Sequence, residues 1–398
     1  MELNSSFVHL KYIYMINRII EKELLRLAQS FPVVTLTGPR QSGKTTLCKM
    51  AFPEYDYVNL ENITLREQVA SDPQGFLHRH EHGLIVDEVQ YLPDLFSYIQ
   101  IWVDDDRNRR VILTGSSNFS LMEKVSQSLA GRAAVLTLLP LSFEELAVNG
   151  INTDCLMLNG GYPAVWGNMQ LPKDVYANYY MTYVERDLRQ LLNVRNLSSF
   201  QQFIRLSAGR ASCEFVASEF ANELGVDIKT IRQWESILET SYITFMLPPY
   251  YRNIGKRIVK TSKRYFMDTG LLCYLLDISN EHQLADHPLR GAIFENMVVA
   301  EMVKRYYNRG KTPRLYYYRD KSQNEVDVVD EISFDQLCAY EIKSSRTYHL
   351  SFNKGLDYFR KLYGDRVVSS MVLYDGQEKS VSPDNGFINF RDWSPDIG

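Results

Sequence analysis

The sequence has few of the features that define several large classes of protein. Five cysteines are scattered along 398 residues without a C-x-x-C pair, which argues against a disulfide framework and a cysteine-based zinc site. No apolar run reaches the roughly 18 residues of a membrane span, and the N-terminus lacks a signal-peptide pattern. Low-complexity tracts and internal repeats are also missing. We therefore expect a cytoplasmic, globular protein with no membrane partner.

Charge of one sign is also not in excess. The net charge of -4 argues against binding nucleic acid along the whole chain, but it allows a local basic surface. A chain of 398 residues exceeds what one hydrophobic core usually serves, so we expect about two to four domains. Met15 opens a clean helical pattern and is an alternative start to Met1.

A phosphate-binding loop follows the first apolar strand. Residues 31–46 read FPVVTLTGPRQSGKTT, so a β-branched run leads into G-x-x-x-x-G-K-T and then into a helical pattern. Glycines let backbone N–H groups turn toward phosphate oxygens, and the following helix presents its positive end. We expect Lys44 to reach the β- and γ-phosphates and Thr45 to ligate Mg²⁺. The predicted binding residues are Gly38, Pro39, Arg40, Gln41, Ser42, Gly43, Lys44, Thr45 and Thr46.

A second apolar strand ends in acid. Residues 83–90 read GLIVDEVQ, so Asp87 and Glu88 directly follow three apolar residues. Asp87 fits the role of a metal ligand, and Glu88 is suited to polarising the attacking water. ATP and Mg²⁺ are therefore the cofactors that we predict.

Several motifs in combination identify a family. They read TGPRQSGKTT, YVNLEN (57–62), LIVDEVQYLPDLF, ILTGSSN, LAGR, LPLSFEEL (139–146), GGYPAV (160–165) and YVERDL (183–188). From Met15 onward the chain resembles the prokaryotic AAA+ proteins usually called predicted ATPases. Their C-terminal domain is of uncharacterised function and is related to PD-(D/E)XK nucleases. The resemblance implies an α/β P-loop core with a parallel sheet and an ATP site, rather than a particular biological role.

The AAA+ pattern assigns roles to polar positions further along this core, residues 1–139. Ser116, with Thr114 and Asn118 as alternatives, stands where AAA+ enzymes carry the polar sensor of the γ-phosphate. Arg132 stands where they carry the arginine finger that serves a neighbouring subunit, which would make the protein a homo-oligomer. The plainer alternatives are a polar turn for the first and an arginine that binds helix-end carbonyls for the second.

Residues 140–196 have a helical pattern that suits the lid of an AAA+ core. A turn at residues 160–163 interrupts the pattern. Arg186 or Arg189 is a candidate lid sensor, although a structural ion pair with a neighbouring acid is the explanation that we favour.

Residues 197–270 have the pattern of a winged helix. Gly225 separates two amphipathic helices, Asp227 can cap the second, and two alternating stretches suit a wing. From 241 to 265 there is no acid but there are six basic residues, which are Arg252, Lys256, Arg257, Lys260, Lys263 and Arg264. A basic surface of this kind is typical of DNA binding. We predict DNA contacts at Lys229, Arg232, Arg252, Lys256, Arg257 and Lys260, and a protein-binding or structural module is the alternative.

Residues 285–398 contain the pattern of a metal-dependent nuclease. Glu295 lies on an amphipathic helix, Asp327 lies in an alternating strand, and Glu341 and Lys343 share one face of the next strand. Such enzymes use two or three carboxylates to hold Mg²⁺ and a lysine to orient or deprotonate water. We predict Glu295, Asp327 and Glu341 as metal ligands and Lys343 as catalytic. Glu-x-Lys alone is a weak signal, because an exposed strand face can carry it as a cross-strand ion pair.

Three functions fit these motifs. The first is an ATP-dependent DNA-processing enzyme with an α/β core, helical lid, winged helix and α/β nuclease-like domain. The second is a nucleotide-operated regulatory or scaffold protein whose nuclease-like domain binds without chemistry. The third is a protein that binds ATP without hydrolysing it. We do not expect a small-molecule kinase, because no substrate-phosphorylating site appears.

Overall fold

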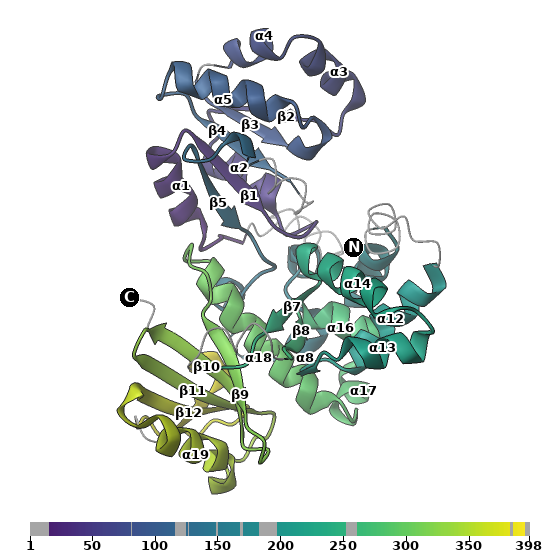
Figure 1. The fold of residues 1–398 in the computed structure, drawn as a ribbon, viewed down its shortest axis with the longest axis vertical. Helices are drawn as coiled ribbons and strands as arrows, with labels where there is room; N and C mark the ends of the chain where they lie inside the picture. Colours follow the sequence, from purple (N-terminus) through teal and green to yellow (C-terminus); the bar gives the residue numbers. More distant parts are fainter. Residues whose placement is uncertain are drawn as a thin grey trace, which may run out of the picture.

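The chain folds into three lobes in the computed structural model (Figure 1). The structure describes residues 16–80, 82–115, 125, 127–148, 150–167, 170–182, 197–251, 261–382 and 385–394. Within these ranges no helix is long and apolar enough to cross a membrane. The N-terminal lobe is purple and blue, the helical lobe teal and green, and the C-terminal sheet green and yellow (Figure 1).

The N-terminal lobe is built on a parallel sheet with the strand order β2-β3-β4-β1-β5. Alternate residues of its central strands enter two separate apolar clusters. Leu84 and Val86 belong to one cluster, while Ile85 belongs to the other. Helices therefore cover both faces, which is why these strands read as unbroken apolar runs. The elements are α1 (Glu21–Ser30), β1 (Val33–Thr37), α2 (Lys44–Ala51), β2 (Asp56–Asn59), α3 (Ile63–Ser71), α4 (Pro73–His78), β3 (Leu84–Asp87), α5 (Leu95–Asp105), β4 (Val111–Thr114) and β5 (Ala133–Thr137). The predicted α/β fold with a parallel sheet is confirmed.

The helical lobe follows. Its first elements are α7 (Phe143–Leu146), α8 (Thr153–Asn159), α9 (Pro163–Gly167) and α10 (Pro172–Tyr179). The next are α12 (Leu197–Gly209), β6 (Cys213–Glu214), α13 (Ala217–Leu224), α14 (Ile228–Thr240), β7 (Thr244–Leu247), β8 (Lys263–Phe266), α16 (Thr269–Leu275) and α17 (Glu281–Ala285). Gly225 ends α13 with a φ of 64°, and the Asp227 side chain accepts from the Thr230 N–H at the start of α14. Both local features agree with the sequence prediction.

The C-terminal lobe is a mixed sheet with the strand order β13-β12-β11-β10-β9. β9, β10 and β11 are antiparallel, whereas β11, β12 and β13 are parallel. The elements are α18 (Arg290–Tyr307), β9 (Leu315–Arg319), β10 (Glu325–Ser333), β11 (Gln336–Lys343), α19 (Lys354–Tyr363), β12 (Val367–Tyr374) and β13 (Gly386–Asn389). Val329 and Ala339 pack in the cluster of α19, while Val328 and Tyr340 pack in the cluster of α18. The two helices therefore cover opposite faces of the sheet.

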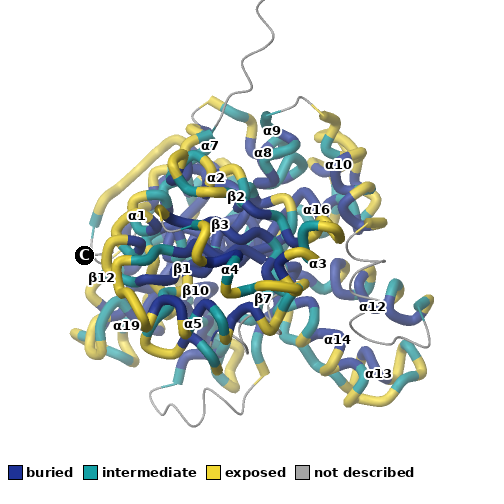
Figure 2. Tube along the Cα trace, turned by 90° about the horizontal axis from the view of Figure 1, so that it is seen from above, coloured by how far each residue is buried: buried dark blue, intermediate teal, exposed yellow. Residues whose placement is uncertain are grey.

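One apolar core joins the segments that the sequence divides into lid, winged helix and nuclease-like domain. It contains Tyr176 of the first, Phe203 of the second and Phe294 of the third. Figure 2 shows buried residues in dark blue through the centre of the molecule, with exposed residues around them. The domain boundaries stay a prediction, and the described lid residues pack as part of the C-terminal assembly.

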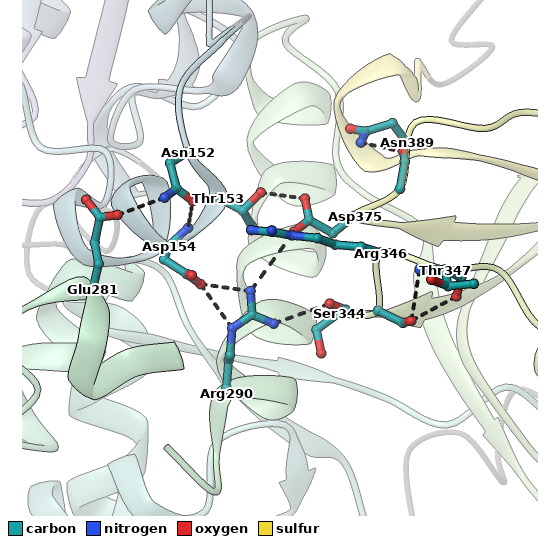
Figure 3. A network of polar contacts seen from close by, with 12 residues as sticks. Asn152, Thr153, Asp154, Glu281, Arg290, Ser344, Arg346, Thr347, Asp375 and Asn389 are labelled. Carbon is teal, nitrogen blue, oxygen red and sulfur yellow. Dashed lines mark hydrogen bonds and ion pairs between the residues drawn. The ribbon is translucent and has the colours of Figure 1, made fainter. Parts of the chain in front are cut away.

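Partly buried ion pairs join the same segments (Figure 3). Arg290, at the start of α18, donates to Asp154 of α8 at 2.8 Å and to the carbonyl of Ser344 at 3.2 Å. Asp375, at the end of β12, accepts from Thr153 of α8, and Arg391 donates to it at 3.3 Å. Helix α8 is thus tied to the carboxyl ends of the C-terminal strands.

Candidate functional site

The phosphate-binding loop connects β1 to α2 and has three residues in the left-handed region. Gly38, Gln41 and Gly43 have φ values of 142°, 60° and 95°. A Cβ at Gly38 would lie 2.1 Å from the carbonyl oxygen of Leu138, so only glycine fits there. This conformation turns successive peptide groups toward a common centre.

The ammonium of Lys44 lies inside this loop. Its Nζ donates to the carbonyls of Gly38 at 3.0 Å and Pro39 at 2.7 Å. Burial lowers the pKa of Lys44 to about 8, while the carboxylates of Glu88 and Asp87 act against that shift. A bound polyphosphate would favour the charged form and attract the ammonium away from these carbonyls.

Asp87, the last residue of β3, accepts hydrogen bonds from side chains of three other elements. One carboxylate oxygen accepts from Thr45 and from Tyr57, both at 2.7 Å, and the other accepts from Thr114. A threonine hydroxyl beside a carboxylate at this distance is a donor set that suits Mg²⁺. Sequence reasoning quoted Tyr57 within a motif but assigned it no role, because only the parallel pairing of β2 with β3 brings it beside Asp87.

The structure describes only some of the remaining residues predicted for this site. Glu88 has a φ of 54°, and its backbone N–H donates to Asp87 at 3.1 Å. Thr114 is buried against Asp87, whereas Ser116 and Asn118 lie outside the described residues. The choice of sensor therefore stays a prediction, as do the roles of Arg186 and Arg189, which lie outside the described residues too.

A cavity of about 590 Å³ opens over the loop. This volume is within the usual range of about 300–1,000 Å³ for a ligand pocket. Besides the loop from Arg40 to Thr46, its walls come from the segment around α1 and from the lid. The lining residues that the sequence did not indicate include Ile16, Arg18, Glu21, Leu141, Pro163 and Thr182.

Arg132 lies away from this cavity. Its guanidinium makes two bonds to the carboxylate of Asp104, at 2.7 and 2.6 Å. It precedes β5, whose first residue, Ala133, pairs with the first residue of β1. Arg132 is therefore at the amino edge of the sheet, opposite the phosphate-binding loop, and its role as a finger for a neighbouring subunit stays a prediction.

The predicted nuclease residues gather around β10, β11 and α18. Asp327 accepts from the Ile342 N–H at 2.8 Å, and Glu341 pairs with Lys343 at 2.6 Å. Burial and the nearby Asp327 raise the pKa of Glu341 to about 8. Burial also raises the pKa of Glu295 to about 7, with Lys263 acting against it and Asp327 adding to it.

Lys263 forms ion pairs with Glu295 and Glu325 beside this group, and this corrects the sequence prediction. Its ammonium lies 2.5 Å from Glu325 and 3.4 Å from Glu295, and the Tyr265 hydroxyl also donates to Glu295 at 2.6 Å. The sequence pattern predicts that Lys263 and Arg264 belong to a basic surface, but both are buried. Since β8 lies inside the molecule, its basic side chains neutralise internal acids.

The acids do not form a preorganised metal site among the residues that the structure describes. Asp327 accepts from a backbone N–H, and Glu295 and Glu341 each pair with a lysine. The second oxygen of Glu341 is buried without a hydrogen-bond partner among the described residues. The metal role of Glu295, Asp327 and Glu341 stays a prediction.

Two predicted DNA contacts are exposed on α14. Lys229 and Arg232 line a shallow hollow together with Gln233 and Ser236. Arg252, Lys256, Arg257 and Lys260 lie outside the described residues.

Three family models match the chain. An AAA domain matches residues 30–147, and domains of unknown function DUF8612 and DUF4143 match residues 152–282 and 290–393. The first match and the loop geometry show a P-loop ATPase domain.

The chain is also similar to individual proteins. It is 32% identical to the uncharacterised protein Rv2008c of Mycobacterium tuberculosis over 335 residues, which are 82% of this chain and 74% of that protein. It is 24% identical to the uncharacterised protein MJ1544 of Methanocaldococcus jannaschii over 426 residues, 95% of this chain and 91% of that one. Among solved structures, the Walker-type ATPase PABY2304 of Pyrococcus abyssi has a TM-score of 0.47 and 16% identity, covering 66% of this chain and 96% of that one.

Proposed function

The chain belongs to the family of the mycobacterial protein Rv2008c, and we propose that it is an ATP-hydrolysing switch that controls a DNA-directed C-terminal assembly. The observation that carries this proposal is the convergence of Thr45, Tyr57 and Thr114 on Asp87 beside a loop that encloses Lys44. A nucleotide bound in the 590 Å³ cavity would place its phosphates against the loop, because Lys44 and Thr45 line this cavity.

The proposed roles at the ATP site follow from position. Lys44 neutralises the β- and γ-phosphates, and Glu88 polarises the attacking water. Thr45 and Asp87 would hold Mg²⁺, which supplies charge neutralisation on the phosphates when bound. The test is phosphate release by the wild type, Lys44→Ala and Glu88→Gln, with the exposed Lys22→Ala as control. Turnover that survives in both site variants would contradict the assignment.

The proposal of DNA binding rests on the helical lobe. The element order α12-β6-α13-α14-β7-β8 and the sheet order β6-β8-β7 support a winged helix. Its second helix, α14, exposes Lys229 and Arg232. The same winged helix contacts the C-terminal acids, because Lys263 of β8 pairs with Glu295. DNA bound to α14 would therefore be held by a unit that touches these acids.

The C-terminal lobe has two candidate functions. A mixed sheet with Asp327, Glu341 and Lys343 clustered near Glu295 supports a nuclease-like active site. The position of Lys263 among the acids favours the second candidate, a catalytically inactive domain that binds a partner under nucleotide control. In that case a lysine takes the place that a metal ion has in an active enzyme.

One experiment separates these functions. Phosphate release is measured with no DNA, with duplex DNA and with single-stranded DNA, and strand cleavage is scored in the same tubes with Mg²⁺. Stimulated turnover with cleavage that disappears in Asp327→Ala supports the nuclease, and stimulated turnover alone supports a regulatory DNA-binding protein. Turnover without either effect would contradict the role of DNA.

A further inference from the structure

Arg18 is a buried arginine beside the phosphate-binding loop to which no motif gives a role. It lies just before α1, is 8% exposed and lines the nucleotide cavity. Its Nη1 donates to the Ser42 carbonyl at 2.7 Å and its Nη2 to the Leu139 carbonyl at 2.6 Å. The guanidinium therefore joins the centre of the loop to the segment that leaves β5.

The bond to Ser42 has a direct consequence for phosphate binding. A peptide group is planar and trans, so its C=O and the next N–H point in opposite directions. When Arg18 holds the Ser42 carbonyl, the N–H of Gly43 points the other way. This N–H is one of the groups that a phosphate-binding loop presents to its ligand.

Glu145 in turn holds Arg18. One carboxylate oxygen of Glu145 accepts from Arg18 Nε at 2.9 Å and from the Ile19 N–H at 3.0 Å. Both side chains are almost fully buried, at 6% and 0% exposed. A buried pair of this kind has a well-defined geometry, because breaking it leaves an uncompensated charge.

The same glutamate connects to the C-terminal lobe. Its other oxygen accepts from the N–H of Ser142 at 2.9 Å, and Asn308, directly after α18, donates to the Ser142 hydroxyl at 3.1 Å. Within α18, Lys304 donates to the Leu141 carbonyl at 3.1 Å. The end of α18 is thus hydrogen-bonded to Leu141 and Ser142, in the segment that leads to Glu145.

We propose that Arg18 is the positioning residue of the phosphate-binding loop and that, through Glu145, it couples the loop to helix α18. A movement of α18 would displace Glu145, and Arg18 would move with it. Because Arg18 is hydrogen-bonded to the Ser42 carbonyl, the Ser42–Gly43 peptide would then change its orientation. Helix α18 also carries Glu295, so one helix contacts the segment at Leu141 and Ser142 near its end and contributes one of the C-terminal acids near its start. The inference rests on the proposed ATP function.

The first test measures the loop directly. We expect Arg18→Met to raise both the Kd for a fluorescent ATP analogue and the KM for MgATP by about 10- to 100-fold, with a smaller fall in kcat. Arg18→Lys should recover part of the affinity, because an ammonium keeps the charge but not the three directed bonds. Glu145→Gln should weaken binding as well, and should add little in the Arg18→Met background.

The possible outcomes distinguish this inference from the function on which it rests. No nucleotide binding by the wild type would overturn the proposed function. Normal binding by both the wild type and Arg18→Met would overturn the role of Arg18 alone. If Arg18→Met does not fold, hydrogen exchange of the wild-type protein tests the coupling. ATP should slow amide exchange in α7 and at the end of α18 but not in α19. An exchange rate in α18 that ATP does not change would overturn the coupling.

The second test addresses the coupling from the distant side. Asn308→Ala removes the bond to Ser142, and we expect the KM for MgATP to rise about 3- to 10-fold. The control is Asn222→Ala, since Asn222 is exposed on α13, an element that takes no part in the contact with Ser142. An Asn308→Ala enzyme with the KM of the control would contradict the coupling.

Discussion

Replacing Arg264 by methionine should destabilise the helical lobe severely. The Arg264 guanidinium lies 2.7 Å from Glu235 and also donates to Ser207 at 2.7 Å. Arg264 and Glu235 are 1% and 2% exposed, so the substitution leaves a carboxylate buried without its counter-ion. Breaking such a pair costs about 3–5 kcal/mol, which is about two to four powers of ten in the folding equilibrium.

The aromatic surroundings of Arg264 lower the cost only slightly. Its guanidinium lies 4.7 Å from the ring centroids of Phe215 and Phe220 and 5.7 Å from that of Phe203. Methionine keeps an apolar contact with these rings, so the lost charge pair accounts for most of the effect. The double variant Glu235→Leu/Arg264→Met removes both charges and should recover most of the lost stability.

The assay is urea unfolding followed by tryptophan fluorescence. Trp234 reports on this lobe because it packs against Phe200 and Phe203, with ring centroids 5.4 and 5.6 Å apart. Burial already raises the pKa of Glu235, and removing Arg264 raises it further. The variant's deficit should therefore be largest at pH 8 and shrink as pH falls through that raised pKa. A loss of less than about 1 kcal/mol in the free energy of unfolding at pH 8, accompanied by weaker DNA binding, would refute the buried pair and indicate that Arg264 lies on the surface.

Three further predictions concern other parts of the molecule. Lys263→Met should lower the free energy of unfolding by about 3 kcal/mol at pH 8, because it leaves two acids without their shared cation; an unchanged urea midpoint would contradict this. Burial raises the pKa of Glu239 from 4.5 to about 7, so the folded state holds an extra proton and loses stability as pH rises through this window. Glu239→Gln should match the wild type at pH 4 and exceed it by about 1–3 kcal/mol at pH 8 in the same unfolding assay. Lys229→Ala/Arg232→Ala should weaken DNA binding and reduce its salt dependence by about two counterions, measured by fluorescence anisotropy against Lys22→Ala, and an unchanged slope would argue against α14 as the contact.

Local chemistry is what the amino-acid sequence determined by itself. The strands before Gly38 and Asp87 can be read from the sequence as unbroken apolar runs, because both faces of their parallel sheet are covered. Gly225 and Asp227 mark the turn and the helix start through their own backbone and side-chain preferences. Features of this kind depend on neighbours a few residues away, so they are readable in one dimension.

Only the tertiary structure decided which charged residues are internal. Arg264 meets Glu235 across 29 positions and Arg18 meets Glu145 across 127, so no spacing rule predicts either pair. The sign of a side chain's charge can be read from the sequence, but its burial depends on which elements pack over it. Strand β8 is internal, so its basic side chains are buried. For the same reason, the sequence indicated the phosphate-binding loop but not the arginine that positions it.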